Sequence, residues 1–210
     1  MRIRVVRHAE RMDFAHPLYW LVCMGQPWSD SPLTPEGTTA ARSLGEKWWS
    51  DGFDPDLVYS SPYLRTMATA TALINHQPVK APLQILPVLS EFQPDSPHKL
   101  HLYPEGMEVI EAPGHRYPLP ESVSQFETRV ATFLDTLCTD SPVEGDLLLV
   151  THGAFIRTLA HLLANRSGHD QNPLQEIPYL TEITIPVQDG TIDLDSVQYG
   201  ATPTPGMQTF

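Results

Sequence analysis

The sequence predicts an α/β domain of three layers, in which helices cover both faces of a mostly parallel central sheet. Short apolar segments typical of strands alternate along the chain with longer segments whose apolar residues recur at helical spacing. One strand segment, Asp146 to Val150, is continuously apolar after its first residue. Such a run is typical of a strand that is buried on both faces of a sheet. Alternating strands and helices together favour parallel strand pairing.

The expected elements begin at the N-terminus and continue to about residue 197. The T-P-E-G sequence at Thr34 predicts a helix start, because Thr is a good N-cap and Pro suits the first helical position. Asp189–Gly190 is a turn signal between two late strands. The expected strands are Arg2 to Val6, Leu57 to Tyr59, Ile85 to Leu89, Asp146 to Val150 and two between Ile177 and Val197; the expected helices run from Thr34 to Gly52, from Ser60–Ser61–Pro62 to Ile74, from Val123 to Leu137 and through Phe155 to Leu163.

The length of 210 residues fits one domain with a substantial core. We expect this domain to span residues 1–200, with a long loop insertion at about 92–120 and a C-terminal tail over 201–210. The insertion is rich in proline and histidine, and loops of this length inside a domain are usually functional or mobile.

The composition restricts the classes of partner. The net charge of −12 argues against a nucleic-acid or anionic-membrane surface, because both require a positive field. The chain has no apolar run long enough to cross a bilayer and no signal-peptide pattern. Cys23 and Cys138 suggest no disulfide framework. We therefore expect a cytoplasmic protein in which any anionic ligand is held by a few local arginines.

Four basic or imidazole side chains follow the ends of predicted strands. Arg7 and His8 come directly after the first strand, Arg65 lies in the first turn of the helix after the second, and His152 follows the strand ending at Val150. Ligands of open α/β sheets bind beyond the carboxyl ends of the strands. Helical side chains lean toward the N-terminus, so Arg65 is expected to point back over the same edge. The pattern predicts an anion site of phosphate size.

We expect neither a metal nor another cofactor. Three histidines of the long loop, His98, His101 and His115, lack the cysteine or carboxylate pattern of a metal centre. In the site predicted above, arginine side chains supply the positive charge that a metal ion would otherwise provide. Four aromatic residues suit either an apolar wall for a leaving group or ordinary packing: Trp20, Trp28, Phe92 and Tyr103.

Several motifs resemble a known family in their residues and in their order. Four motifs resemble the histidine phosphatase superfamily, which has the phosphoglycerate mutase-like fold. They are V-R-H-A-E-R at Val6–Arg11, L-T-P-E-G at Leu33–Gly37, S-S-P-Y-L-R-T at Ser60–Thr66 and V-T-H-G at Val150–Gly153. Three further motifs resemble the phosphatase domains of the suppressors of T-cell receptor signalling and the ecdysteroid-phosphate phosphatases. They are R-M-D at Arg11–Asp13, Y-W-L at Tyr19–Leu21 and I-P-Y-L at Ile177–Leu180. The resemblance spans nearly the whole chain, and it implies a homodimer.

The resemblance also implies a role for each matching residue. His8 is the expected nucleophile, which would form a phosphohistidine, and the expected ligands of the phosphoryl oxygens are Arg7, Arg11, Arg65 and His152. One departure from the family pattern is Ala9, where glycine is usual. The backbone carbonyl at this position is expected to fix the tautomer of His8, and alanine can still supply it.

The expected proton donor is Glu91, in V-L-S-E-F, which falls where the family places its acid. A carboxylic acid there could protonate the leaving group and then deprotonate the water that attacks phosphohistidine. Three other acids of the same long loop are alternatives for this role: Glu105, Glu108 and Glu111.

The resemblance implies a metal-independent phosphomonoester hydrolase, a histidine phosphatase. The expected substrate is a phosphoprotein, as for a protein tyrosine phosphatase acting on phosphotyrosine, or a bulky phosphorylated small molecule. One alternative is a phosphoglycerate mutase-like phosphotransferase, although Lys99 and Arg116 are the sole cations between Phe92 and Pro120 to hold a charged sugar acid. The other alternative is a catalytically weak scaffold domain that binds a phosphorylated ligand.

Overall fold

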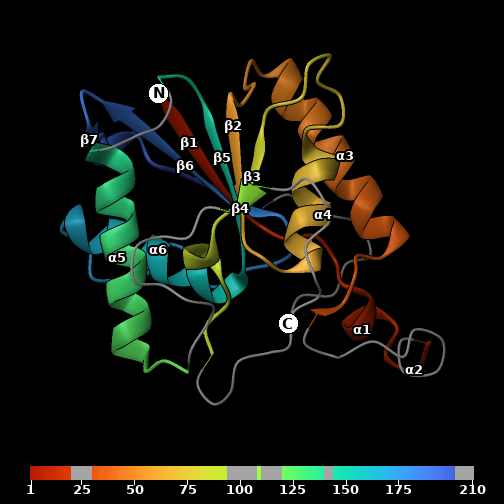
Figure 1. The fold of residues 1–210 in the computed structure, drawn as a ribbon. Helices are drawn as coiled ribbons and strands as arrows, with labels where there is room; N and C mark the ends of the chain where they lie inside the picture. The colour runs from red at the N-terminus through yellow and green to blue at the C-terminus, as the bar shows by residue number, and fades with distance from the viewer. Residues whose placement is uncertain (20–29, 94–107, 110–119, 140–143, 202–210) are drawn as a thin grey trace.

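A central sheet brings the carboxyl ends of several parallel strands together (Figure 1). The computed structural model describes residues 1–19, 30–93, 108–109, 120–139 and 144–201. The strands are β1 (Arg2–Arg7), β2 (Leu57–Ser60), β3 (Leu83–Ile85), β4 (Glu108–Val109), β5 (Leu147–Thr151), β6 (Thr181–Gln188), β7 (Thr191–Ile192) and β8 (Gln198–Ala201). The helices are α1 (Met12–Ala15), α2 (Pro17–Tyr19), α3 (Pro35–Ser50), α4 (Leu64–Leu73), α5 (Val123–Thr139) and α6 (Gly153–Arg166), with 3₁₀ turns at Pro87–Leu89 and Leu194–Ser196.

The sheet is parallel over its larger part. Its strand order is β4-β3-β2-β5-β1-β6-β7, and β8 also pairs with β6. All neighbours from β4 to β1 pair in parallel, whereas β6 runs antiparallel to β1, β7 and β8. The predicted α/β class with a mostly parallel sheet is confirmed.

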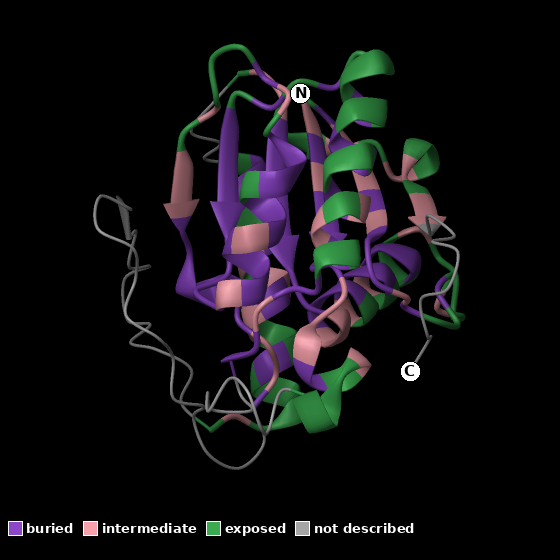
Figure 2. Cartoon of the chain, turned by 90° about the vertical axis from the view of Figure 1, so that its right-hand side faces the viewer, coloured by how far each residue is buried: buried purple, intermediate pink, exposed green. Residues whose placement is uncertain are grey.

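Helices cover both faces of this sheet, as the continuous apolar strand predicted. One core cluster joins α5 and α6 to the face that carries Ile3 and Val5 of β1. The other joins α3 and α4 to the face that carries Val6. Figure 2 shows buried strands beneath helices whose outer sides are exposed. In the described part of the chain, no helix is long and apolar enough to cross a membrane.

The start of α3 fixes the loop that follows β1. Thr34 is the N-cap, and its Oγ1 accepts a hydrogen bond of 2.8 Å from Gly37 N. Gly37 packs against the backbone of Glu10, where an added Cβ would lie 2.6 Å from the carbonyl oxygen. The backbone N–H of Thr34 also donates to Glu10 O, at 3.0 Å. The T-P-E-G sequence therefore serves both as a helix start and as a close support for residues 8–11.

One predicted strand differs from the structure, and one further strand was not predicted. The segment Ile85 to Leu89 was expected to be a strand, but β3 ends at Ile85 and Pro87–Leu89 forms a 3₁₀ turn. Pro87 has no N–H for a strand ladder, so pairing ends before it. The two strands expected between Ile177 and Val197 are present as β6 and β7, and the additional strand β8, which begins at Gln198, pairs with β6.

Other parts of the prediction are confirmed or lie outside the described residues. The turn at Asp189–Gly190 joins β6 to β7, with φ of 51° and 73°, the left-handed conformation of a tight hairpin. Within the expected insertion at 92–120, β4 pairs with β3, whereas residues 94–107 and 110–119 lie outside the described chain. The domain boundaries and most of the tail over 201–210 therefore remain predictions.

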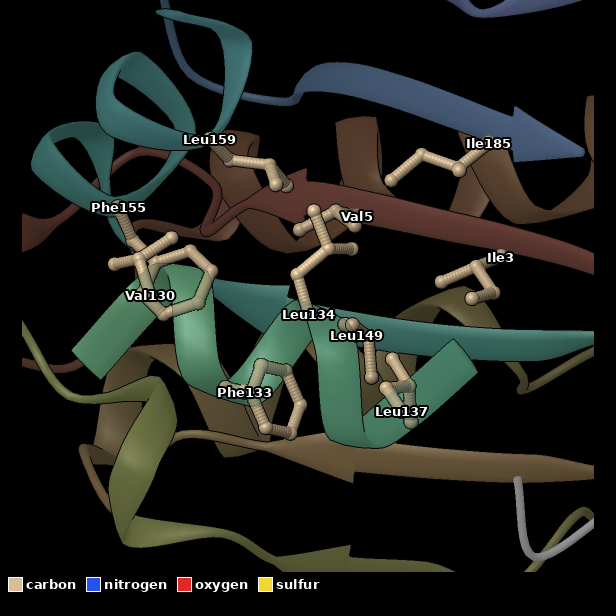
Figure 3. Close-up of a pocket in the computed structure, with 10 residues that line it drawn as sticks. All are labelled: Ile3, Val5, Val130, Phe133, Leu134, Leu137, Leu149, Phe155, Leu159 and Ile185. Carbon is tan, nitrogen blue, oxygen red and sulfur yellow. The ribbon is translucent and has the colours of Figure 1, made fainter. Parts of the chain in front are cut away.

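A small apolar cavity of about 10 Å³ lies between the sheet, α5 and α6 (Figure 3). Its lining includes Leu134, a side chain only 3% exposed. A void of this size, with almost no polar surface, offers no partners for a water molecule. The core is therefore slightly under-packed at this position.

We predict that Leu134→Ala lowers the free energy of unfolding by about 3 kcal/mol, because it enlarges a void that rigid neighbours cannot close. Urea denaturation at pH 7.5 measures this loss. The control is Val123→Ala, on the same helix at a position 60% exposed, which is expected to change stability by less than about 0.5 kcal/mol. Equal losses in the two variants would contradict the cavity interpretation.

Candidate active site

The register of three parallel strands sets two histidines next to each other. Arg7 of β1 pairs with Thr151 of β5, and Ser60 of β2 pairs with Val150. His8 N donates to the carbonyl of Thr151, at 2.9 Å, so the pairing continues past the strand end. The rings of His8 and His152 lie 5.4 Å apart, centroid to centroid. Both side chains are almost fully buried, at 1% and 0% exposure.

Arg65 completes this group from the first turn of α4. Its Nη2 donates to Nδ1 of His152, at 3.2 Å, and its side chain is 2% exposed. The guanidinium also stacks on the ring of Tyr63, 4.3 Å from the centroid. The helix start is anchored by Asp30, whose carboxylate accepts a hydrogen bond of 2.7 Å from Leu64 N. The expected convergence of residues 8, 65 and 152 is thus present in the structure.

A strained turn before β6 holds Arg7. The guanidinium of Arg7 donates to the carbonyl of Ile177 and lies 4.4 Å from the ring centroid of Tyr179. Leu180 has a φ of 60°, a left-handed conformation that is costly for a leucine. Within the described chain, Nε of Arg7 is buried without a hydrogen-bond partner and lies against Gly153.

Arg11 lies beside these groups, and its guanidinium is oriented by Asp13. Arg11 Nε donates to Asp13 Oδ1 at 2.7 Å, and Asp13 is 3% exposed. The charge of Arg11 contributes to lowering the pKa of both Arg65 and His152, after the larger effect of burial. Arg11 therefore acts electrostatically on the site, while direct phosphate binding by this residue remains a prediction.

Glu91 contacts the site from the segment that follows the 3₁₀ turn. Its Oε2 lies 3.2 Å from Nδ1 of His152 and 3.8 Å from Nη2 of Arg65. Its side chain is 25% exposed, so it borders the buried group on the solvent side. Of the six residues predicted for the site, five are brought together and Arg11 lies alongside.

The hydrogen bond from His8 to its own loop defines its tautomer. Nδ1 of His8 lies 2.8 Å from the carbonyl oxygen of Ala9, which can only accept, so Nδ1 carries the proton. Nε2 therefore keeps its lone pair. Burial, and then the charges of Arg65 and Arg7, hold the pKa of His8 well below its usual value. The ring is neutral and nucleophilic at pH 7.

The alanine at position 9 supplies the expected carbonyl without crowding the loop. Ala9 is fully buried in the core cluster formed with α3 and α4. Its N–H donates to Thr69 Oγ1 at 3.0 Å. The methyl group thus packs into the core.

The pKa values of Glu91 and His152 are both lowered, but burial acts on the two groups in opposite directions. Burial, assisted by Arg65, lowers the pKa of His152 to about 4, although Glu91 opposes this shift. For Glu91, burial alone would raise the pKa, but the neighbouring His152, Arg65 and Arg7 outweigh it and lower the pKa to about 2. At neutral pH the ligand-free site therefore contains the Glu91 carboxylate and the neutral ring of His8.

The same groups invite a comparison between a metal ion and an anion as ligand. One ligand atom each of His8, Glu91 and His152 lie within 4.8 Å of one another, a spacing open to a metal ion. However, Nη2 of Arg65 lies 3.2 Å from Nδ1 of His152 and 3.8 Å from Oε2 of Glu91, and the charge of Arg7 also acts on His8 and Glu91. A cation there would be repelled by both arginines, whereas an anion would be attracted. The site favours an anion.

Several residues that shape the site were not singled out from the sequence. His152 Nε2 lies 2.7 Å from Ser61 Oγ, and Tyr63 packs edge-on against the His152 ring at 4.8 Å. Ser61, Tyr63 and Tyr179 all fall inside motifs used for the family resemblance, which was the available signal. Phe92 packs on Phe126, with centroids 5.2 Å apart, and so belongs to the core rather than to a leaving-group wall.

Some predicted residues lie where the structure gives no side chain. Those outside the described side chains are the aromatics Trp20, Trp28 and Tyr103, the alternative acids Glu105, Glu108 and Glu111, and the histidines His98, His101 and His115. Their roles remain predictions.

The fold and the site together define an α/β protein with a buried, neutral histidine held between arginines at the carboxyl ends of parallel strands. Residues 3–193 match the model of the histidine phosphatase superfamily (branch 1), and the chain belongs to this family. The family resemblance of the motifs is therefore confirmed.

Relatives agree with this assignment. An uncharacterized phosphoglycerate mutase family protein of Acanthamoeba polyphaga mimivirus is 35% identical over 185 residues, which cover 88% of this chain and 89% of that protein. The ecdysone phosphate phosphatase of Bombix mori, solved with tungstate, has a TM-score of 0.68 at 18% identity over 97% of this chain and 93% of that one. The phosphoserine phosphatase of Entamoeba histolytica has a TM-score of 0.59 at 18% identity over 96% and 97%. These structures show the phosphoglycerate mutase-like fold.

We predict that the free energy of unfolding falls as the pH drops from 6.5 toward 4. The folded state lowers the pKa of His8 and His152, so the unfolded chain binds more protons in this range. Each such proton contributes a slope of up to about 1.4 kcal/mol per pH unit. Urea unfolding at pH 7.5, 6 and 5 measures it. His152→Gln is expected to flatten the dependence, and a stability that rises on acidification contradicts the prediction.

Proposed function

We propose that this protein is a metal-independent phosphomonoester hydrolase that acts through a phosphohistidine on His8. The observation that carries the proposal is the state of His8, a buried neutral ring whose Nδ1–H is fixed on the Ala9 carbonyl. Its free Nε2 lone pair lies in a space where Arg7 and Arg65 both act electrostatically. A nucleophile in the required tautomer and cations for the phosphate are thus combined.

In the first step, Nε2 of His8 attacks phosphorus, a P–N bond forms and the P–O bond to the leaving group breaks. Arg7, Arg65 and His152 are the proposed ligands of the phosphoryl oxygens, with Arg11 contributing its charge from the side. Guanidinium groups stabilise charge on these oxygens as it redistributes, which is the main catalytic task in phosphoryl transfer.

Glu91 is the proposed proton donor, and substrate binding changes its protonation. In the ligand-free site its pKa of about 2 keeps it ionised. A phosphate dianion placed among the same arginines offsets their charge and repels the carboxylate, so the pKa of Glu91 rises. Glu91 then carries the proton that the leaving oxygen takes. In the second step it removes a proton from the water that attacks phosphorus, and the P–N bond breaks.

The proposed substrate is a phosphomonoester with a bulky leaving group, either phosphotyrosine or a phosphorylated small molecule. The fold likeness to the ecdysone phosphate phosphatase supports a bulky small molecule. A cytoplasmic location and a homodimer are proposed with it, and nucleic acid is disfavoured as a partner by the net charge of −12.

A mutase activity is the second candidate, because the mimivirus relative carries the name of the phosphoglycerate mutase family. Incubation with a phosphoglycerate separates the two candidates. A hydrolase releases inorganic phosphate, whereas a mutase moves the phosphoryl group to the neighbouring hydroxyl without net release. Accumulation of the isomer alone would overturn the hydrolase proposal.

We predict that the protein hydrolyses p-nitrophenyl phosphate in the presence of EDTA and that His8→Ala lowers kcat at least about 1,000-fold, because the covalent route is lost. The release of p-nitrophenol measures the rate. His161→Gln, at an exposed position of α6, is the matched control and is expected to retain wild-type turnover. Absence of turnover by the wild-type chain across pH 4–9 would instead support the scaffold alternative.

We predict that Glu91→Gln slows poor leaving groups more than good ones. Glutamine cannot donate a proton to the departing oxygen, and a phenoxide needs that proton more than a p-nitrophenoxide does. The expected loss in kcat is about 100-fold for phenyl phosphate and under about 10-fold for p-nitrophenyl phosphate. Equal losses for both esters would remove Glu91 from the acid role.

A further inference from the structure

Arg129 of α5 holds the backbone from which Glu91 projects. Its Nη1 donates to the carbonyls of Val88 and Ser90, the latter at 3.1 Å. These two carbonyls lie on the N-terminal side of Glu91, and Ser90 is its direct neighbour. One guanidinium nitrogen therefore bridges the end of the 3₁₀ turn and the residue before Glu91.

The guanidinium of Arg129 is itself fixed in orientation. Its Nε and Nη2 both donate to the carboxylate of Glu121, with the Nε bond at 3.0 Å. The face of the group lies 4.7 Å from the ring centroid of Phe126. The side chains of Arg129 and Glu121 are only 9% and 13% exposed. A bidentate pair that is stacked and largely buried has little freedom to rotate.

The segment after Glu91 is anchored by the same region. The N–H of Glu121 donates to the carbonyl of Gln93 at 2.9 Å, and the amide of Gln93 donates to the hydroxyl of Tyr63. Tyr63 packs against both Arg65 and His152. Residues on both sides of Glu91 are thus tied to α5 and to the phosphate site.

Glu91 depends on this support because the groups that its carboxylate contacts do not hold its backbone. Its carboxylate meets His152 and Arg65, both of which belong to other elements. The residue follows a turn limited by Pro87 and precedes the long loop, so no regular strand or helix fixes its backbone. A displacement of about 1 Å in a proton donor can reduce a rate by about two orders of magnitude.

We propose that the Arg129–Glu121 pair is the positioning unit for Glu91, which sets the proton donor at the leaving-group oxygen. This inference rests on the proposed function of the site. Arg129 is a positioning residue rather than a catalytic one, because its hydrogen bonds go to Glu121 and to backbone carbonyls. Loss of the pair is expected to impair leaving-group protonation while phosphate binding and His8 attack persist.

The test compares two phosphate esters in Arg129→Gln and Glu121→Gln. In each variant kcat for phenyl phosphate is expected to fall about 10-fold, and kcat for p-nitrophenyl phosphate less than about 2-fold. The inhibition constant for inorganic phosphate is expected to stay within about 2-fold of wild type. Arg166→Gln, which removes the α6 partner of Asp135 on α5, is the matched control and should affect neither ester.

A double-mutant cycle separates positioning from a general effect on the fold. If Arg129 acts through Glu91, Glu91→Gln combined with Arg129→Gln is no slower on phenyl phosphate than Glu91→Gln alone. Additive losses, or equal losses for the two esters, would overturn the inference. Arg129→Lys retains the charge but cannot form the bidentate hydrogen bond to Glu121. This variant is expected to slow phenyl phosphate more than p-nitrophenyl phosphate, which keeps the test valid even if Arg129→Gln unfolds. If His8→Ala turned over substrate as fast as the wild type, the proposed function itself would be refuted.

Discussion

The parallel pairing of β5 with both β1 and β2 is the constraint on which the site depends. Because of this pairing, the three strands end at the same level. His8, Ser61 and His152, which directly follow these strands, therefore lie next to one another. The pairing continues one residue beyond the strands, through His8 N to the carbonyl of Thr151 and Ser61 N to the carbonyl of Val150. A slip of one residue in either pairing would reverse the faces of the side chains and separate the two imidazoles.

The second constraint is electrostatic, because this edge of the sheet concentrates positive charge in a buried place. Arg65 is 2% exposed, and burial lowers its pKa to about 10, which still leaves it charged at pH 7. Buried cations without full compensation are costly, and the nearby carboxylate of Glu91 offsets part of that cost. A bound phosphate would compensate the remainder.

The sequence predicted what depends on local patterns, and it missed what depends on long-range contacts. The strand–helix alternation, the Thr34 helix start and the Asp189–Gly190 turn were readable because each uses residues near one another in the chain. The positions of Arg7, His8, Arg65 and His152 followed from the rule for strand ends. The hydrogen bonds of Arg129 to Val88 and Ser90 were not readable, since they join α5 to a segment about forty residues away in the chain. The expected strand at 85–89 was wrong because its apolar pattern outweighed Pro87 in the prediction.

The candidate catalytic residues differ in their exposure to solvent. This difference has a consequence for the order in which the first product leaves and water attacks. His8 and His152 are sealed from solvent at 1% and 0%, whereas the Glu91 side chain is 25% exposed. Under the proposed mechanism, the departing alcohol and the incoming water both pass the solvent-exposed side of the Glu91 carboxylate. The first product therefore leaves before water can attack the phosphorylated imidazole, which is the ping-pong order of a double displacement.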